Sequence, residues 1–423
     1  MDFLTHLSSW LSPKEIDELN QALLEKESKH ALLLNTNKMS EETFLKLYPN
    51  VIPHPIVKHA FIYDKNEYDF GKYIYHDLGS YYLQEPSAMS VAFLLGFENG
   101  EKVLDMCAAP GGKTIQASLL LNDTGFVISN DISKNRAGAI LENIERLGIG
   151  NVIITNNDFS LIENQYNNYF DKIILDAPCS GSGMFRKQSE MKEDWSIQKV
   201  LKYAEIQKNL IKTCYKMLKP GGKMSYSTCS FSLEENEEVV ESLLNFTDVK
   251  TINLENLNLF QYDKKPLGYH FLPNKFPGEG QYICIIQKPG NHEISKDVLN
   301  KLNESKFYGI PKEFIHQFGD TYFMLKSKEK FKKLNIIREG VKLGEINKNI
   351  LKYDHHYASY IKSFPNELEL TLQDALKYFE GNSLNIPFKK GFFLLKYNGL
   401  NIDIAKSDGN VIKNKFPKYL RKK

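Results

Sequence analysis

Short apolar runs alternate along the middle of the chain with longer stretches in which apolar residues recur at helical spacing. The runs predict strands at 103–106, 126–130, 152–155, 173–176, 223–227 and 281–286. The longer stretches predict helices at 113–121, 133–147, 196–218 and 234–245. Nearly continuous apolar strands between helices are typical of a parallel sheet covered on both faces, so we expect an α/β fold.

The pattern divides the chain into three expected domains. Residues 1–90 mix helices with short strands, and Ser12 to Glu15 form a capping box with proline at the first helical position, which predicts the start of a helix. We expect a small N-terminal α+β domain there, whose role the residues do not reveal. Residues 91–290 hold the alternating strands and helices, and residues 291–423 form a C-terminal region.

The composition indicates a folded protein without a membrane segment. Of the 423 residues 42% are hydrophobic and 25% are charged. No run reaches the ~18 apolar residues of a membrane helix, and the N-terminus lacks the basic-then-apolar pattern of a signal peptide. The five cysteines show no CxxC spacing, so we expect reduced thiols, a cytoplasmic location and no bound metal.

The net charge of +2 conceals an uneven distribution. Residues 291–423 contain 25 lysines and arginines against 15 acids, a net charge of +10, and residues 1–290 contain 29 against 37, a net charge of −8. The last twelve residues, from Ile412, hold six basic side chains and no acid. Charge alone leaves two interpretations of this ending open, a solvated tail and a patch that binds phosphate groups.

One stretch, Val103 to Thr114, has the order strand, glycine turn, helix that opens a nucleotide-binding βαβ unit. Pro110, Gly111 and Gly112 predict the tight turn, in which backbone can approach a ligand closely. The free N–H groups at the start of the following helix would face that ligand.

Two phosphate-bearing ligands fit this stretch poorly. Gly112 to Thr114 match the end of a Walker A loop, but Cys107 stands where its first glycine belongs, and Pro110 stiffens a loop that must wrap phosphate. The dinucleotide motif GxGxxG is absent. S-adenosylmethionine (SAM) remains, and it requires an acid at the end of the second strand to bind the ribose hydroxyls, which Asp131 supplies.

Acids and thiols gather at the ends of the predicted strands. In an open α/β sheet, ligands bind at the carboxyl ends of the strands. The residues at or just beyond those ends are Asp105, Asp131, Asp158, Asp176, Cys179 and Cys229. Cys214 on a helix stripe and Cys284 inside a strand fit inert core cysteines, whereas Cys179 and Cys229 lie in Gly/Ser-rich loops.

Three segments, Met106 to Thr114, Asp176 to Gly183 and Ser227 to Ser230, resemble the RNA 5-methylcytosine methyltransferases of the Nol1/Nop2/Sun family. Within it the chain is similar to the bacterial RsmF group, which modifies 16S ribosomal RNA. Weaker matches to that group lie at 82–89, 276–281, 342–346 and 415–421. The group usually has Pro-His before the Gly-Glu-Gly turn, where this chain has Pro273-Asn274, so a role of that histidine is not carried over.

The resemblance implies a Rossmann-like SAM-dependent methyltransferase core with a PUA-like RNA-binding region at the C-terminus. It also implies roles for particular residues. Cys229 would be the nucleophile that adds to cytosine C6, Cys179 would release the product, and Asp176 would position the base. The residues implied to bind SAM are Cys107, Ala108, Ala109, Pro110, Gly111, Gly112, Lys113, Asp131, Arg136, Asp158 and Asp176.

The expected function is therefore SAM-dependent formation of 5-methylcytidine in 16S rRNA by a cytoplasmic monomer. The target base must be flipped out or unpaired to reach the rim of the sheet. Three alternatives stay open: a DNA cytosine methyltransferase with Cys179 as nucleophile, an RNA-binding ribosome assembly factor without turnover, and methylation of another RNA such as tRNA. Whether naked rRNA or the assembled 30S subunit is the substrate also stays open.

Overall fold

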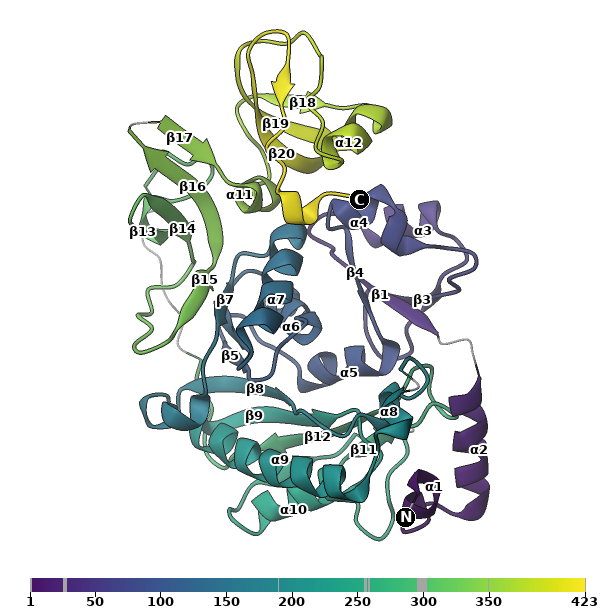
Figure 1. The fold of residues 1–423 in the computed structure, drawn as a ribbon. Helices are drawn as coiled ribbons and strands as arrows, with labels where there is room; N and C mark the ends of the chain where they lie inside the picture. The colour runs from purple at the N-terminus through teal and green to yellow at the C-terminus, as the bar shows by residue number, and fades with distance from the viewer. Residues whose placement is uncertain are drawn as a thin grey trace.

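The computed structural model describes residues 2–25, 29–188, 190–254, 257, 259–294, 303–348 and 350–422. A large central sheet with helices on both faces lies between an N-terminal sheet and two C-terminal sheets (Figure 1). The fold is thus a Rossmann-like core with a small N-terminal α+β part and further β-rich parts after it. No helix among the described residues is long and apolar enough to cross a membrane.

The central sheet has the strand order β10-β12-β9-β8-β5-β6-β7-β15, and β11 also pairs with β12. Its parallel strands are β5 (Lys102–Asp105), β6 (Phe126–Asn130), β7 (Val152–Thr155), β8 (Phe170–Asp176) and β9 (Leu218–Thr228). Strand β12 (Gln281–Gln287) runs antiparallel to β9, and β10 (Lys250–Ile252) and β11 (Tyr269–Phe271) are short. All six predicted strands are present, and β9 begins five residues before the predicted 223.

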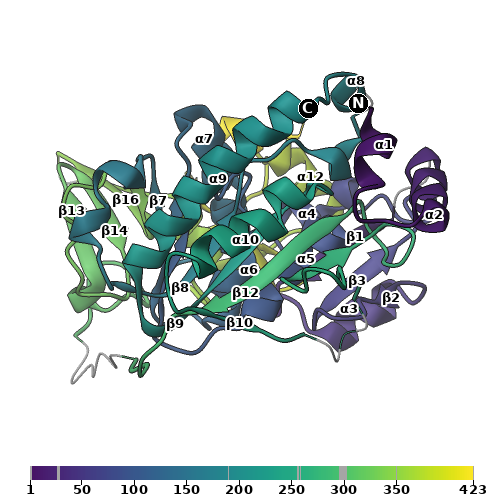
Figure 2. The same ribbon diagram turned by 90° about the horizontal axis from the view of Figure 1, so that it is seen from below.

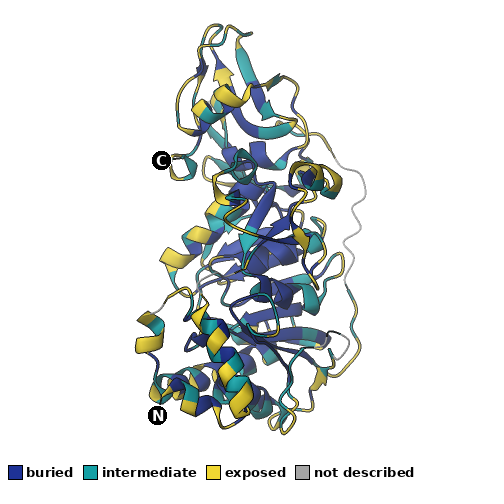
Figure 3. Ribbon diagram, turned by 90° about the vertical axis from the view of Figure 1, so that its right-hand side faces the viewer, coloured by how far each residue is buried: buried dark blue, intermediate teal, exposed yellow. Residues whose placement is uncertain are grey.

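Helices cover both faces of this sheet, as predicted. Helices α5 (Pro86–Leu95), α6 (Gly112–Leu120) and α7 (Lys134–Leu147) bury their apolar residues in one core with Val103, Val127 and Val152. Helices α9 (Ile197–Met217) and α10 (Glu237–Leu244) cover the other face, and Figure 2 shows both lying across the sheet. Figure 3 shows the strands buried between helices that expose their outer sides.

The N-terminal residues form a four-stranded antiparallel sheet of order β2-β3-β1-β4. Its strands are β1 (His30–Leu34), β2 (Ile52–Pro53), β3 (Ala60–Tyr63) and β4 (Tyr81–Gln84), with helices α3 (Glu41–Leu47) and α4 (Ile74–Asp77) beside them. The predicted capping box starts α2 (Pro13–Leu24). Helix α1 (Phe3–Leu7) and Trp10 pack against Phe185, Trp195 and Phe231 of the core. The N-terminal end of the chain therefore contacts the loops that follow β8 and β9.

The C-terminal part contains two more four-stranded sheets. The first consists of β13 (Ile315–Phe318), β14 (Thr321–Met324), β16 (Val341–Asn347) and β17 (Ile350–Tyr353). Helix α11 (His355–Tyr360) follows. The second sheet contains β18 (Glu367–Glu369), β19 (Gly391–Tyr397), β20 (Leu400–Ser407) and β21 (Ile412–Lys413), with helix α12 (Leu372–Phe379).

One strand of this C-terminal part, β15 (Ile336–Glu339), joins the central sheet and pairs antiparallel with β7. The sequence did not predict this strand, which directly follows the lysine-rich segment 326–333. Asn335 continues the contact beyond the strand, since its carbonyl accepts a hydrogen bond of 3.0 Å from the N–H of Asn156. The pairing protects the edge of β7. The lysine-rich segment itself begins at the amino end of the sheet, where Lys326 contacts Asp123 and Glu329 contacts Lys102, the first residue of β5.

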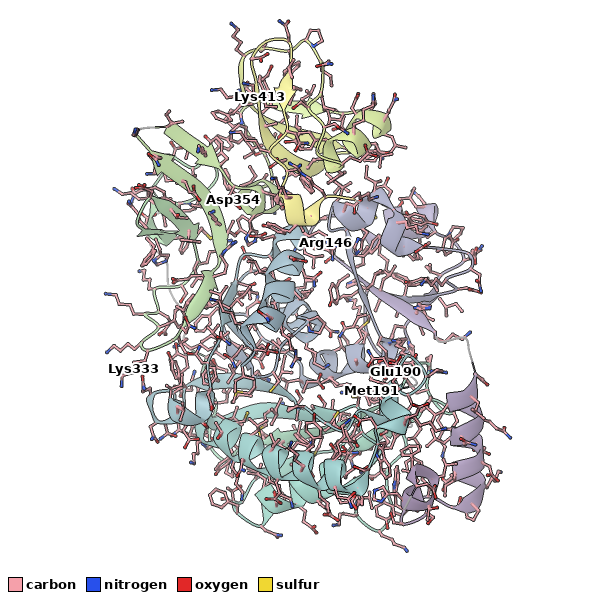
Figure 4. The ribbon with its side chains drawn as sticks, viewed as in Figure 1. Arg146, Glu190, Met191, Lys333, Asp354 and Lys413 are labelled. Atoms are coloured by element: carbon pink, nitrogen blue, oxygen red, sulfur yellow. The ribbon has the colours of Figure 1, made fainter. Side chains whose placement is uncertain are left out.

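The basic C-terminal ending packs onto the protein. Phe416 is 2% exposed, the Tyr419 hydroxyl donates to Glu145, and Lys422 lies 2.7 Å from Asp77. Lys413 (labelled in Figure 4), Lys415 and Lys418 remain exposed, and Lys423 lies outside the described residues. A solvated tail is therefore wrong for this segment as a whole, because an apolar anchor and an ion pair hold it in place.

Candidate active site

Five parallel strands end at the same edge of the central sheet, and the predicted site residues lie along that edge. Asp105 and Asp176 are the last residues of β5 and β8, and Asp131 and Cys229 directly follow β6 and β9. Cys179 lies in the loop after β8. The structure therefore brings together most of the predicted residues.

The two loop thiols are in contact: Sγ of Cys179 lies 3.2 Å from Sγ of Cys229. The hydrogen bond with Cys229, followed by burial, raises the pKa of Cys179 well above its usual value. Cys179 therefore holds its proton and can donate it to the sulfur of Cys229. Cys214 and Cys284 are 0% and 1% exposed in the core, as predicted for structural cysteines.

Asp176 is held by three donors from three elements. Its Oδ2 lies 2.6 Å from Nζ of Lys113, and its Oδ1 accepts hydrogen bonds from Ser227 (2.7 Å) and Gln281 (2.9 Å). Burial lowers the pKa of Lys113, but the charge and hydrogen bond of Asp176 outweigh burial and raise it. Lys113 is therefore a cation committed to Asp176, which argues against a Walker lysine reserved for phosphate.

The glycine turn is required by the protein itself. Gly111 caps the start of α6 with φ at +109°, a conformation that favours glycine. A Cβ on Gly112 would lie 2.8 Å from Nε2 of Gln84 and 3.1 Å from Cε1 of Tyr82. The segment 82–89 thus packs directly against the turn, which explains Gly112 without reference to a ligand.

Two buried carboxylates at this edge have an oxygen with no hydrogen-bond partner among the described residues. Asp131 Oδ1 accepts from the N–H of Ser133 (2.8 Å), but its Oδ2 has only Arg136 Nη2 at 3.4 Å. Asp105 Oδ2 accepts from Thr114 (2.7 Å), Oδ1 is unpaired, and burial raises the pKa of Asp105 to about 7. A buried acceptor without a hydrogen bond can receive one from a bound ligand or from water.

The remaining predicted residues lie around these acids. Arg136 donates to the carbonyl of Ala109 (3.1 Å), next to Pro110, which ties α7 to the glycine turn. Asp158 is exposed and accepts from the N–H of Ser160 (3.0 Å). Asp158 thus lies at the outer end of the site.

Several residues of the site were not predicted. Ser227, Gln281 and Glu235 bond directly to the predicted residues or to their neighbours, and Ile132, which follows Asp131, is 71% exposed. The position of Ser227 in the strand that ends just before Cys229 could have identified it, because alternate residues of a strand share a face. Nothing in the sequence places Gln281 or Glu235 beside these residues, since they belong to other elements.

Buried polar contacts join the weaker motifs to the site. Glu85 accepts a hydrogen bond of 2.7 Å from the N–H of Glu279, whose carboxylate lies 2.7 Å from Nε of Arg186. A Cβ on Gly183 would come within 2.8 Å of the Cys229 carbonyl. Asn274, where the resembled group usually has histidine, donates to Glu18 of α2 at 3.4 Å.

Three family models match the chain. Residues 92–287 match "16S rRNA methyltransferase RsmB/F", residues 1–86 match the N-terminal domain of 16S rRNA methyltransferase RsmF, and residues 365–422 match the methyltransferase RsmF PUA domain. The C-terminal part is thus PUA-like at its end. The matched segments correspond to the first sheet, the central sheet with its helices, and the last sheet of the fold.

Relatives and solved structures agree with these matches. The ribosomal RNA small subunit methyltransferase F of Vibrio atlanticus is 29% identical over 99% of this chain and 97% of its own. A methyltransferase homolog from Pyrococcus horikoshii is 27% identical, with a TM-score of 0.58 over 67% of this chain and 93% of its own. NSun6 from the same organism, 20% identical, shares the fold with a TM-score of 0.62 over 69% of this chain and 98% of its own.

The enzyme of the same name from Vibrio parahaemolyticus is 30% identical over 92% of this chain and 91% of its own. Similarity at that level over nearly the whole length covers the core, the N-terminal part and the PUA-like end together. With the thiol pair and the acids gathered at one edge of a Rossmann-like sheet, these matches identify the chain as a member of the ribosomal RNA small subunit methyltransferase F family.

Proposed function

We propose that this protein transfers a methyl group from SAM to C5 of a cytidine in 16S rRNA, through a covalent bond between Cys229 and C6 of the base. The observation that carries the proposal is the contact of the two sulfur atoms, 3.2 Å apart at the carboxyl edge. One thiol can act as nucleophile while the other handles a proton. The names of the relatives support ribosomal RNA as the substrate.

The residues at the edge fit SAM. The buried Oδ2 of Asp131, which accepts no hydrogen bond and has the Arg136 guanidinium 3.4 Å away, suits a ribose hydroxyl, which is a donor. The exposed face of Ile132 lies beside it, and the turn from Cys107 to Lys113 begins α6 with free N–H groups. When bound, SAM supplies an electrophilic methyl group on its sulfonium sulfur.

Cys229 begins the reaction by adding to C6. Its sulfur forms the S–C6 bond, and the electron pair of the C5–C6 double bond becomes available at C5 for the methyl group. Asp176 holds the polar edge of the base, and Lys113, Ser227 and Gln281 fix the direction of its carboxylate. Before the addition, the S–H of Cys179 stabilises the thiolate of Cys229 by donating a hydrogen bond to it.

Cys179 completes the reaction by removing the C5 proton. Once Cys229 is bonded to carbon, its sulfur carries no negative charge, so its hydrogen bond with Cys179 weakens and its charge no longer raises the pKa of Cys179. Cys179 can then give its proton to solvent and accept the proton from C5. The electron pair of the C5–H bond re-forms the double bond, and the S–C6 bond breaks to return Cys229 as thiolate.

The experiment that tests this function incubates the protein with methyl-labelled SAM and 16S rRNA, both free and within 30S subunits. We expect label in the RNA, and bisulfite sequencing should locate it at cytidine C5. Label at another atom, or transfer only to tRNA or DNA, contradicts the proposal.

Replacing Asp131 by alanine should weaken SAM binding. The change removes a buried acceptor for a ribose hydroxyl, and one hydrogen bond to a charged group contributes about 1.5–3 kcal/mol. We therefore expect the dissociation constant measured by calorimetry to rise roughly 10- to 100-fold. The control is Glu142→Ala, which removes an exposed acid of α7 outside the residues implied to bind SAM and should leave the constant unchanged. Unchanged affinity in Asp131→Ala means that the ribose binds elsewhere.

The exposed lysines of the C-terminal ending should bind RNA phosphates. Changing Lys413, Lys415 and Lys418 to glutamine leaves Phe416 and the Lys422–Asp77 pair in place. We expect the slope of log affinity against log salt concentration to fall by roughly 0.7–0.9 for each lysine–phosphate ion pair that the substitutions remove. Filter binding to 16S rRNA over a range of salt concentrations measures this slope.

The matched control changes three exposed lysines of the N-terminal part, Lys14, Lys46 and Lys58, to glutamine. It alters the net charge equally and should leave the slope nearer to that of the unchanged protein. Equal slopes in the two triple variants show that the C-terminal lysines act only through net charge.

A further inference from the structure

The carboxylate of Glu235 is completely buried next to both thiol loops, although no motif in the sequence marked it. Glu235 ends the 3-10 turn Leu233–Glu235, between β9 and α10, and is 0% exposed. Its Oε1 accepts hydrogen bonds from the N–H of Ser180 (2.8 Å) and the side-chain amide of Gln207 (3.1 Å). Its Oε2 accepts from the hydroxyls of Ser230 (2.6 Å) and Ser180.

The residues that donate hydrogen bonds to Glu235 show which parts of the active site its carboxylate connects. Ser180 directly follows Cys179, and Ser230 directly follows Cys229. Gln207 donates also to the carbonyl of Pro178, on the other side of Cys179, at 2.8 Å. The carboxylate of Glu235 thus connects the loop after β8, the residues just after β9 and the long helix α9.

A fully buried acid next to the two thiol loops needs a physical explanation. Removal from water raises the pKa of Glu235, and its four donors work in the opposite direction. A buried carboxylate is costly unless its hydrogen bonds are complete. Packing of the two loops could be achieved by an apolar side chain, but an apolar side chain would not fix their backbone atoms in direction and distance.

We propose that Glu235 is a positioning residue of the active site, whose carboxylate clamps the Cys179 loop to the Cys229 loop and so sets the separation of the two sulfur atoms. This role rests on the proposed function, in which the sulfur atoms must act in sequence on one base. A shift of either loop by about 1 Å would misplace a reacting atom, and such shifts cost on the order of 10²-fold in rate.

The charge of Glu235 also affects the pKa of Cys179, and this effect distinguishes a positioning residue from a purely structural one. The hydrogen bond to Cys229, burial and the charge of Cys229 raise the pKa of Cys179, and the charge of Glu235 adds to them. A neutral side chain of the same shape should therefore let Cys179 lose its proton at lower pH. A purely structural residue would not alter this titration.

The test compares Glu235→Gln with Glu234→Gln. Glu234 is the adjacent residue, half-buried, and lies 3.1 Å from His6 rather than beside the thiol loops. Single-turnover methylation of 16S rRNA at saturating SAM should slow roughly 10- to 100-fold in Glu235→Gln. It should stay near the unchanged rate in Glu234→Gln. SAM affinity, measured by calorimetry, should be unchanged in both.

The second measurement follows alkylation of Cys179 by iodoacetamide as a function of pH, with the modified peptide quantified by mass spectrometry. The midpoint should move to lower pH in Glu235→Gln and stay in place in Glu234→Gln. This measurement needs no RNA. If the unchanged protein fails to methylate 16S rRNA, the proposed function is wrong, while the alkylation profile still decides on the positioning role.

The double variant Ser180→Ala/Ser230→Ala provides an independent route if Glu235→Gln does not fold. It keeps the carboxylate and removes both hydroxyl donors, so the N–H of Ser180 and the amide of Gln207 still donate to it. A slower single turnover at unchanged SAM affinity supports the clamp. A rate and an alkylation midpoint equal to those of the unchanged protein, in either variant, overturn it.

Discussion

Replacing Cys229 by alanine should abolish methylation and leave SAM affinity unchanged. The sulfur acts on C6 of the base, and the residues that fit the cofactor, such as Asp131, lie after a different strand. Removal of a covalent nucleophile can lower turnover by about 10⁶-fold, so we expect a loss of more than about 10³-fold here. Incorporation of labelled methyl groups into 16S rRNA measures the loss, and calorimetry measures SAM affinity.

The control for loss of a thiol is Cys214→Ala. Cys214 is 0% exposed on α9, and its replacement should reduce stability slightly without a change in turnover per folded molecule. Turnover by Cys229→Ala within about tenfold of the unchanged protein contradicts the nucleophile role, and it assigns the attack on C6 to another residue.

Much of the fold and the site follows from local patterns in the sequence. Strands buried on both faces read as apolar runs, so their existence and their parallel arrangement were predictable. Their carboxyl ends then had to meet at one edge. Asp105, Asp131, Asp176 and Cys229 therefore could be placed together before any contact between them was known, since each lies within two residues of the end of a predicted strand.

The contacts between elements could not be predicted in this way. Strand β15 has only four residues, all half-buried, and its pairing with β7 depends on a connection of more than 150 residues between them. In the sequence, Glu235 is one of several acids in an acidic turn, and only the tertiary structure shows that its carboxylate is buried. The direction of a side chain across such distances is decided by packing, which periodicity does not encode.

The glycine turn also combines a local feature that the sequence predicted with contacts between elements that it did not. The sequence correctly predicted a turn at Gly111 and Gly112 but assigned both glycines to the approach of a ligand. The structure gives internal reasons: Gly111 has positive φ, and Gly112 makes room for Gln84. The segment 82–89, matched only through resemblance, is therefore part of the wall of the cofactor turn.

Replacing Cys179 by alanine separates the two thiols. If Cys179 removes the C5 proton, the variant should still form the S–C6 bond and accept the methyl group. The C5 proton then stays in place, and the bond to Cys229 cannot break by elimination. We expect a protein–RNA species that survives denaturing gel electrophoresis, at a yield approaching one per active site.

This covalent species should depend on the other cysteine. The double variant Cys179→Ala/Cys229→Ala should give no such band, because no sulfur remains to attack C6. Without the sulfur atom 3.2 Å away, the thiolate of Cys229 also lacks the donor that stabilises it, so the band should form more slowly at neutral pH and faster as the pH rises.

The opposite pattern would exchange the roles of the two residues. A band that forms with Cys229→Ala and is absent with Cys179→Ala means that the loop after β8 supplies the nucleophile, as in the DNA-methyltransferase alternative. The raised pKa of Cys179 opposes that outcome, because a thiol that keeps its proton is a poor nucleophile. Removal of the C5 proton comes after Cys229 has bonded to C6, when Cys229 no longer raises the pKa of Cys179 in this way, so the raised pKa does not oppose the role of Cys179 as the base.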